Sequence, residues 1–264
     1  MQTNLQRSDG NLNIELNNNE IKTLFQSGSS KVLLPNSYNA NKELVLINTT
    51  GGITCNDSLK IKINLENSNA SISTQAAEKI YAGIGEPAQV DIDIILKNTN
   101  LNWLPKELIL FNNSKLKRRI NINIDSNSNL IFCETSVLGR KAMSEKIRNM
   151  FFSDIWKVTK DSNLKHMEAI NINEKINEVL NNRFTLNNHS SFSTILIFGK
   201  IVESIQDDIR KTIEKINDIF CELSIWNEKI VIRSIANDNY DLKKTLNYIL
   251  KNIIHDKLPK NWNL

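Results

Sequence analysis

Residues 48–81, NTTGGITCNDSLKIKINLENSNASISTQAAEKIY, contain the pattern that decides the fold. Gly51 and Gly52 open the stretch as a tight turn, and apolar and polar residues then alternate from residue 61 to residue 65. A period of two places one set of side chains in a core and the other in water, so we expect a β-strand here. The stretch closes on STQAAEK, residues 73–79, a polar run that strand formation alone does not require. We expect function to reside in this run.

The same alternation recurs downstream, at residues 90–94 and 120–124. Short linkers rich in Asn and Ser, such as residues 67–69 and 125–129, separate the alternating segments. Many short strands joined by tight turns predict a β-rich body, and they leave a sandwich, a barrel and a solenoid-like stack open. We interpret the heavy use of Asn and Lys as a compositional bias rather than a functional demand.

The last third of the chain changes character. Apolar residues recur at helical spacing from residue 205 to 220 and from residue 242 to 253, with charged residues between them. Residues 192–198 and 229–233 have the apolar runs of strands. A weaker helix candidate covers residues 173–183. The order of these elements predicts a mixed segment of strands and helices after the β-rich body.

We therefore divide the chain into a β-rich body, residues 1–190, and an α+β C-terminal segment with two helices, residues 191–264. A chain of 264 residues can bury one sizeable core, so we expect both parts to pack in the same domain. The predicted fold class is mainly β with C-terminal helices, α+β overall.

Charge and cysteine usage bear on partners and compartment. The net charge is only +4, and the densest basic cluster lacks interleaved aromatic residues, so we interpret it as a solvated strand edge rather than a nucleic-acid patch: Lys115, Lys117, Arg118 and Arg119. No apolar run is long enough to span a bilayer. Cys55, Cys133 and Cys221 show neither CxxC spacing nor a disulfide framework. We expect a cytoplasmic protein that binds neither nucleic acid nor membrane.

The sequence contains no recognisable catalytic or metal-binding motif. His166, His189 and His255 stand alone, and there is no nucleophile elbow, Walker loop or GxGxxG. Several carboxylates lie beside turns or at strand ends, but nothing in the sequence shows that two of them converge: Asp57, Glu78, Glu107, Glu134 and Glu145. These observations favour a non-enzymatic protein, with no catalytic residue and no tightly bound cofactor.

The opening stretch and four later segments resemble the UreD family of urease accessory proteins, called UreH in some systems. The turn matches the family's NTxGG…D element, and the polar run matches its TTQAAEKxY element. The later matches follow in the family's order: WLPQE at Trp103–Glu107, LGRxAMGE at residues 138–145, VVR at residues 231–233 and PRxW at residues 258–262. The family-motif residues are Asn48, Gly51, Gly52, Trp103, Pro105, Gly139 and Arg140. Cys55-Asn56 replaces a second Gly pair of the family, and Ser144 replaces a Gly.

The resemblance implies a function. UreD-like proteins are not enzymes; they form a complex with UreF and the GTPase UreG, dock on urease apoprotein and help to deliver nickel to its active site. The family fold is a β-helix-like body of stacked strands with helices near the C-terminus, and a passage through that body has been proposed as the nickel route. The alternatives from other classes are a β-rich ligand- or protein-binding module unrelated to urease and a metal-dependent hydrolase.

A nickel passage would need oxygen or nitrogen ligands that hold the ion weakly, because thiolate or multi-histidine sites would trap it. We therefore expect nickel in transit rather than a resident metal. The residues that we expect to line the passage are Asp57, Thr74, Gln75, Glu78 and Glu107. The alternative is that these side chains form hydrogen bonds within the β stack and fix the fold.

Overall fold

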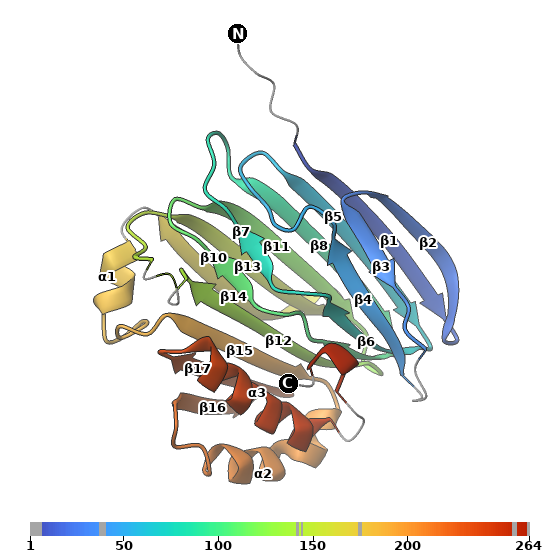
Figure 1. Ribbon diagram of the computed structural model, residues 1–264. Helices are drawn as coiled ribbons and strands as arrows, with labels where there is room; N and C mark the ends of the chain where they lie inside the picture. The colour runs from blue at the N-terminus through green and yellow to red at the C-terminus, as the bar shows by residue number, and fades with distance from the viewer. Residues whose placement is uncertain are drawn as a thin grey trace.

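The computed structural model describes residues 7–36, 41–140, 143, 145–173, 176–254 and 258–262. Within these residues the strands form two large sheets that face each other, with helices gathered at one end (Figure 1). The mainly β, α+β class predicted from the sequence is confirmed. None of the described helices is long and apolar enough to cross a membrane.

The strands divide between a seven-stranded and a ten-stranded sheet in the part of the chain that the structure describes. The seven-stranded sheet contains β1 (Asp9–Asn17), β2 (Glu20–Gly28), β5 (Ser58–Glu66), β8 (Ala88–Lys97), β11 (Lys115–Ile124), β13 (Phe151–Lys160) and β14 (Asn163–Asn173). The ten-stranded sheet contains β3 (Ser30–Leu33), β4 (Lys42–Asn48), β6 (Asn69–Thr74), β7 (Glu78–Ile80), β9 (Asn100–Trp103), β10 (Leu108–Leu110), β12 (Asn129–Leu138), β15 (Ser191–Phe198), β16 (Phe220–Trp226) and β17 (Lys229–Ala236).

The middle of the chain winds between the two sheets as a stack of coils. It passes from β5 to β6 and β7, then from β8 to β9 and β10, then from β11 to β12. Each strand pairs in parallel with its equivalent in the next coil, so that Ile61 lies opposite Ile92, and Ile92 opposite Ile120. The inward-facing set of each alternating segment, such as Ile63, Ile94 and Ile122, fills the core between the sheets.

Asparagine has a structural role at the corners of this stack, which the interpretation as compositional bias missed. Asn67 and Asn98 hold left-handed backbone, with φ of 46° and 48°, which Asn tolerates better than other residues that carry a side chain. Their amides also bond from coil to coil, since Asn98 Nδ2 donates to Asn67 Oδ1 at 2.8 Å. Asn69, Asn100 and Asn129 form a second such ladder, with both links at 2.8 Å.

The C-terminal strands continue the ten-stranded sheet. β15 pairs antiparallel with β12 on one side and with β17 on the other. Helices α2 (Ile201–Ile213) and α3 (Asn239–Ile253) cover the outer face of this part of the sheet and bury a second apolar core against it. The predicted helix over residues 205–220 is wrong at its end, because α2 stops at Ile213 and Phe220 begins β16. The weaker helix candidate in the connector is confirmed as α1 (Ile176–Asn181).

The basic cluster on β11 is not at a sheet edge, so that interpretation is wrong. β11 lies between β8 and β13 and pairs with both in parallel. Successive side chains of a strand point to opposite faces, so Arg119 turns outward and pairs with Asp91 at 2.7 Å, whereas Arg118 turns into the space between the sheets and is only 7% exposed.

The left-handed corners can be tested at Asn98. Alanine and glycine both remove the amide, but alanine must also adopt a backbone conformation that only glycine takes freely. We expect Asn98→Ala to have a free energy of unfolding about 1 kcal/mol lower than that of Asn98→Gly, measured by denaturant titration. At Asn102, inside β9 and absent from the left-handed positions, the order should reverse because glycine weakens a strand. The same order at both sites would contradict this account.

Candidate functional site

The ten-stranded sheet has an opening between β4 and β7. β4 pairs with β6 as far as Leu46 and Thr74, and Gln75 N then donates to Leu46 O at 2.8 Å. Beyond that point β7 turns away from β4 and pairs with β10. Ile53 closes the opening at its other end, donating to Lys79 O and accepting from Tyr81 N, both at 2.8 Å. The opening therefore leads between the two sheets.

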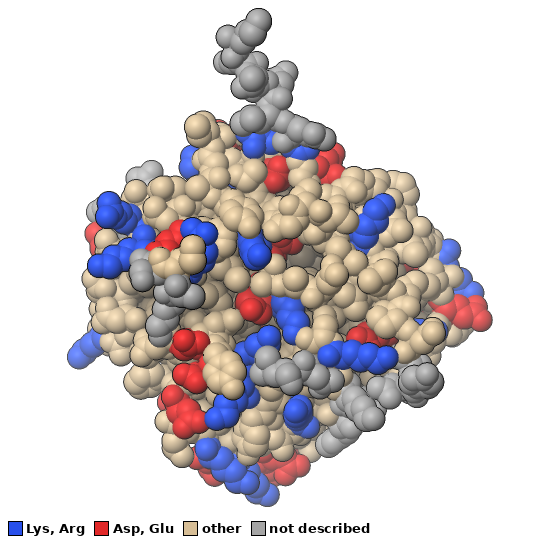
Figure 2. Space-filling model, viewed as in Figure 1, with Lys and Arg blue, Asp and Glu red and all other residues tan. Residues whose placement is uncertain are grey.

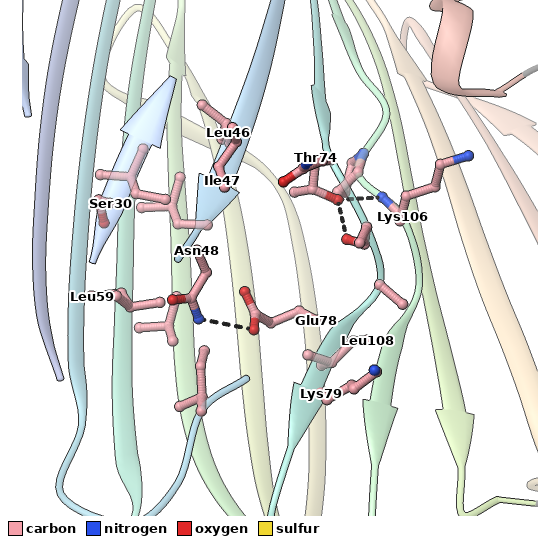
Figure 3. A pocket seen from close by; sticks show the side chains of 18 of the residues that line it. Ser30, Leu46, Ile47, Asn48, Leu59, Thr74, Glu78, Lys79, Lys106 and Leu108 are labelled. Carbon is pink, nitrogen blue, oxygen red and sulfur yellow. Dashed lines mark hydrogen bonds between the residues drawn. The ribbon is translucent and has the colours of Figure 1, made fainter. Parts of the chain in front are cut away.

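A cavity of about 220 Å³ lies behind the opening. Figure 2 shows this face hollowed near its centre, and Figure 3 shows the side chains around the cavity. Apolar side chains of the seven-stranded sheet, including Leu59 and Ile92, form its far wall. A divalent cation with six waters needs about 180 Å³ at about 30 Å³ per water, so the cavity is large enough for a hydrated ion.

Glu78 and Asn48 reach across the opening toward each other (Figure 3). Asn48 Nδ2 donates to Glu78 Oε1 at 3.0 Å, and Asn48 Oδ1 is oriented by the backbone N–H and the hydroxyl of Thr50. Burial raises the pKa of Glu78 from 4.5 to about 7, because loss of solvation outweighs the Asn48 hydrogen bond and the attraction of Arg118. Near neutral pH this carboxyl can therefore exchange its proton for a cation.

Thr74, Gln75 and Glu78 all border the cavity, as does Lys106 on the opposite loop. The Thr74 hydroxyl donates to Ala76 O at 3.0 Å and accepts from Lys106 N at 2.8 Å, so it ties the two rim loops together. Half-buried Lys106 has its pKa lowered to about 8 by burial and by neighbouring Lys243.

Residues 258–262 fasten the same rim from outside. Asn261 Nδ2 donates to Ser73 Oγ at 3.0 Å and to Thr74 O at 2.6 Å, and Asn261 O accepts from Lys106 Nζ. Trp262 Nε1 donates to Leu104 O at 2.7 Å. These bonds fix the two loops that border the opening.

Asp57 and Glu107 do not join the other three predicted residues. Asp57 is buried beside a separate surface cavity, where its carboxylate accepts from Ser8 N and Thr54 N, both at 2.8 Å. Glu107 accepts from Asn239 Nδ2 at 3.1 Å, against the start of α3, and is not among the residues that line the cavity behind the opening. Both carboxylates have a hydrogen-bonding role in the fold.

The family-motif residues fall into two places. Asn48, Gly51, Trp103 and Pro105 line the cavity, and Gly52 lies beside it, where a Cβ would come within 2.4 Å of the Tyr81 ring. Gly139 and Arg140 lie elsewhere: Arg140 pairs with Glu145 at 3.0 Å and stacks over Phe111 at 4.5 Å. Three other residues of the sequence analysis, Lys141, Ala142 and Ser144, and also His255, lie outside the described residues.

A buried ion cluster at the inner end of the cavity was not predicted. Arg118 makes two bonds to Asp154, from Nε at 2.9 Å and from Nη2 at 2.6 Å, and a third from Nη1 to Glu134 Oε2 at 2.8 Å. Trp103 Nε1 donates to Glu134 Oε1 at 2.8 Å. Burial raises the pKa of Glu134, and this effect is larger than the opposing effect of Arg118.

The sequence did carry a signal for this cluster. Each of its three charged residues occupies an inward-facing position of its strand, in the sequences LKRRI, FCETS and FSDIW. The first and third strands alternate, and the second is buried on both faces. A charge among apolar inward-facing residues is costly unless it has a partner, so three such positions on strands that follow one another in the chain indicate that the charges meet. Across the described residues, no three His, Cys, Asp or Glu side chains converge as a ready metal site.

The raised pKa of Glu78 predicts a pH-dependent stability. Between pH 4.5 and about 7 the folded chain holds a proton that the unfolded chain has lost, so this stabilisation is complete below pH 4.5 and is lost as the pH rises through about 7. At about 1.4 kcal/mol per pKa unit, the loss is at most roughly 3–4 kcal/mol. Glu78→Gln should abolish it, so denaturant titrations should show the variant gaining stability over the wild type across this window. If the free energies of unfolding of the variant and the wild type change in parallel with pH, the raised pKa of Glu78 is contradicted.

Comparison with known proteins gives one consistent family. The family model described as UreD urease accessory protein matches residues 8–261. The urease accessory protein UreD of Rhizobium johnstonii is 31% identical over 92% of this chain and 89% of its own length. UreD 1 of Brucella anthropi is 33% identical over 92% of this chain and 88% of its own, and UreD of Azorhizobium caulinodans is 28% identical over 98% and 97%. The chain therefore belongs to the UreD family of urease accessory proteins.

Proposed function

We propose that this chain acts in urease maturation as a non-enzymatic scaffold that passes nickel toward the urease apoprotein through the cavity between its sheets. It would work in the cytoplasm, in a complex with UreF and, through UreF, with the GTPase UreG. Membership of the family sets aside a binding module unrelated to urease. The observation that carries the proposal is the opened sheet, with Glu78 at the opening and Glu134 at the inner end of one cavity.

The chemistry of the cavity suits a cation in transit. Carboxylate and amide oxygens bind nickel more weakly than thiolates or clustered imidazoles do, so the ion can leave again. Glu78 offers such an oxygen at the opening, and Glu134 offers another within the sandwich. The apolar far wall gives a dication nothing to bind, so the ion would be held only at the polar positions.

The role of the cavity can be tested by nickel-dependent urease activation. Glu78→Gln should lower activation by about tenfold, as expected when one ligand of a metal pathway is lost. Ala77→Trp, which places a large ring in the cavity lining, should lower it by blocking the space. Glu107→Gln is the matched control, because it makes the same substitution outside the cavity and should activate urease like the wild type. Normal activation by both cavity variants, with folding and complex formation intact, would refute the nickel path.

The scaffold role has a separate test. The purified chain should co-elute with UreF in size-exclusion chromatography, and adding UreG should give a larger complex only when UreF is present. Glu78→Gln should bind UreF like the wild type, because Glu78 faces the cavity rather than a partner surface. If the folded chain fails to bind UreF at micromolar concentrations, the scaffold role is wrong even if the cavity variants impair activation.

A further inference from the structure

The ion cluster at the inner end of the cavity joins the two sheets. Arg118 on β11 and Asp154 on β13 are register partners in the seven-stranded sheet, and Glu134 reaches them from β12 in the ten-stranded sheet. All three residues are more than nine-tenths buried, with exposures of 7%, 1% and 3%. The cluster is therefore a buried set of salt bridges, deep in the sandwich, rather than a surface one.

The three charges do not balance. One guanidinium faces two carboxylates, which gives the cluster a formal charge of −1 when both are ionised. A buried charge without a full partner is costly, so the cluster is suited to accept more positive charge. Arg118 and Glu134 border the cavity, whereas Asp154 is absent from its lining and is fully occupied by the two Arg118 bonds. A cation in the cavity can therefore reach Glu134.

The two sides of Arg118 are held unequally. The side toward Asp154 is a bidentate fork, which is the stronger and more directional form of this contact. The side toward Glu134 is a single bond from Nη1, and the other oxygen of Glu134 is bound to the Trp103 indole. Arg118 can release Glu134 while Asp154 keeps the guanidinium in place.

We propose that Arg118 is a positioning residue that acts as an internal competitor for the cargo cation. In the empty cavity it occupies Glu134; a divalent cation displaces it from that oxygen, and Arg118, tethered by Asp154, then retakes Glu134 as the cation leaves. This inference rests on the proposed function. Without the competitor, the inner carboxylate would hold the cation longer, and the passage would act as a store.

The test removes the competitor and keeps the charge. Arg118→Met with Asp154→Asn leaves Glu134 as the one charged member, so the cluster keeps its formal charge of −1. The folded variant, loaded with Ni²⁺ and desalted, should retain more nickel and release it to a chromogenic chelator at least about tenfold more slowly than the wild type, as expected for close charge pairs. Urease activation should fall as release slows. Glu134→Gln should instead retain less nickel than the wild type.

The matched control is on the next residue of the same strand. Arg119→Met with Asp91→Asn removes an exposed ion pair from the outer face of the same sheet and should leave nickel retention and release unchanged. If the double variant at the inner cluster does not fold, Arg118→Lys replaces it: a single ammonium cannot keep the fork to Asp154 while it competes for Glu134, so release should again be slower.

The outcomes separate the two claims. Wild-type release rates in the folded variants at Arg118, together with impaired activation by Glu78→Gln, would overturn the competitor and leave the passage standing. Normal activation by every cavity variant would overturn the passage itself. Slower release by the Arg118 variants, with unchanged release by the Arg119 variant, is the result that we expect.

Discussion

The whole site depends on how a β-sheet can open without leaving backbone groups unpaired. A buried N–H or C=O without a partner costs about as much as a lost hydrogen bond, so neighbouring strands part only where each finds another partner. On the open edge of β7, Ile53 donates to Lys79 O and accepts from Tyr81 N, and on the open edge of β4, Leu46 O accepts from Gln75 N. β3 and β10 pair with the opposite edges of these two strands. The short length of β7 and the turn at Gly51-Gly52 make this rearrangement possible. The cavity is a consequence of that redistribution of hydrogen bonds.

The polar groups around the cavity have two roles: some hold the rim in place, and others face the cavity. The rim is fixed by hydrogen bonds from the side chains of Thr74, Asn48 and Asn261. The Glu78 carboxylate uses one oxygen for its bond to Asn48, and its other oxygen remains on the cavity side. Burying the charges of the inner cluster costs desolvation free energy. The same charges join the two sheets and keep a carboxylate within reach of the cavity. A purely apolar core would be simpler to stabilise, but it would offer a cation no ligand.

Local pattern predicted the strands well, because alternation reports directly which face is buried. It predicted the polar run of residues 73–79 as a site of interest, and the structure places that run at the opening. It could not show that Asn48 meets Glu78, since that contact depends on where β4 and β7 part. Asp57 misled because a carboxylate near a glycine turn looks free in sequence, yet distant Ser8 and nearby Thr54 use both its oxygens. Arg118 was interpreted wrongly because it was grouped with its basic neighbours, although its position in the alternating strand places it on the inward face.

The fastening of the rim by Asn261 has a kinetic consequence. Its bonds to Ser73 and Thr74 join residues 188 and 187 positions apart in the chain, whereas neighbouring coils join residues about thirty apart. Contacts of high sequence separation carry the largest loop-closure cost and form late in folding. We therefore expect the coils to assemble first and the rim to be the last part to become ordered. The same region would then be the first to open under mild denaturation, so the cavity would lose its shape before the body around it unfolds.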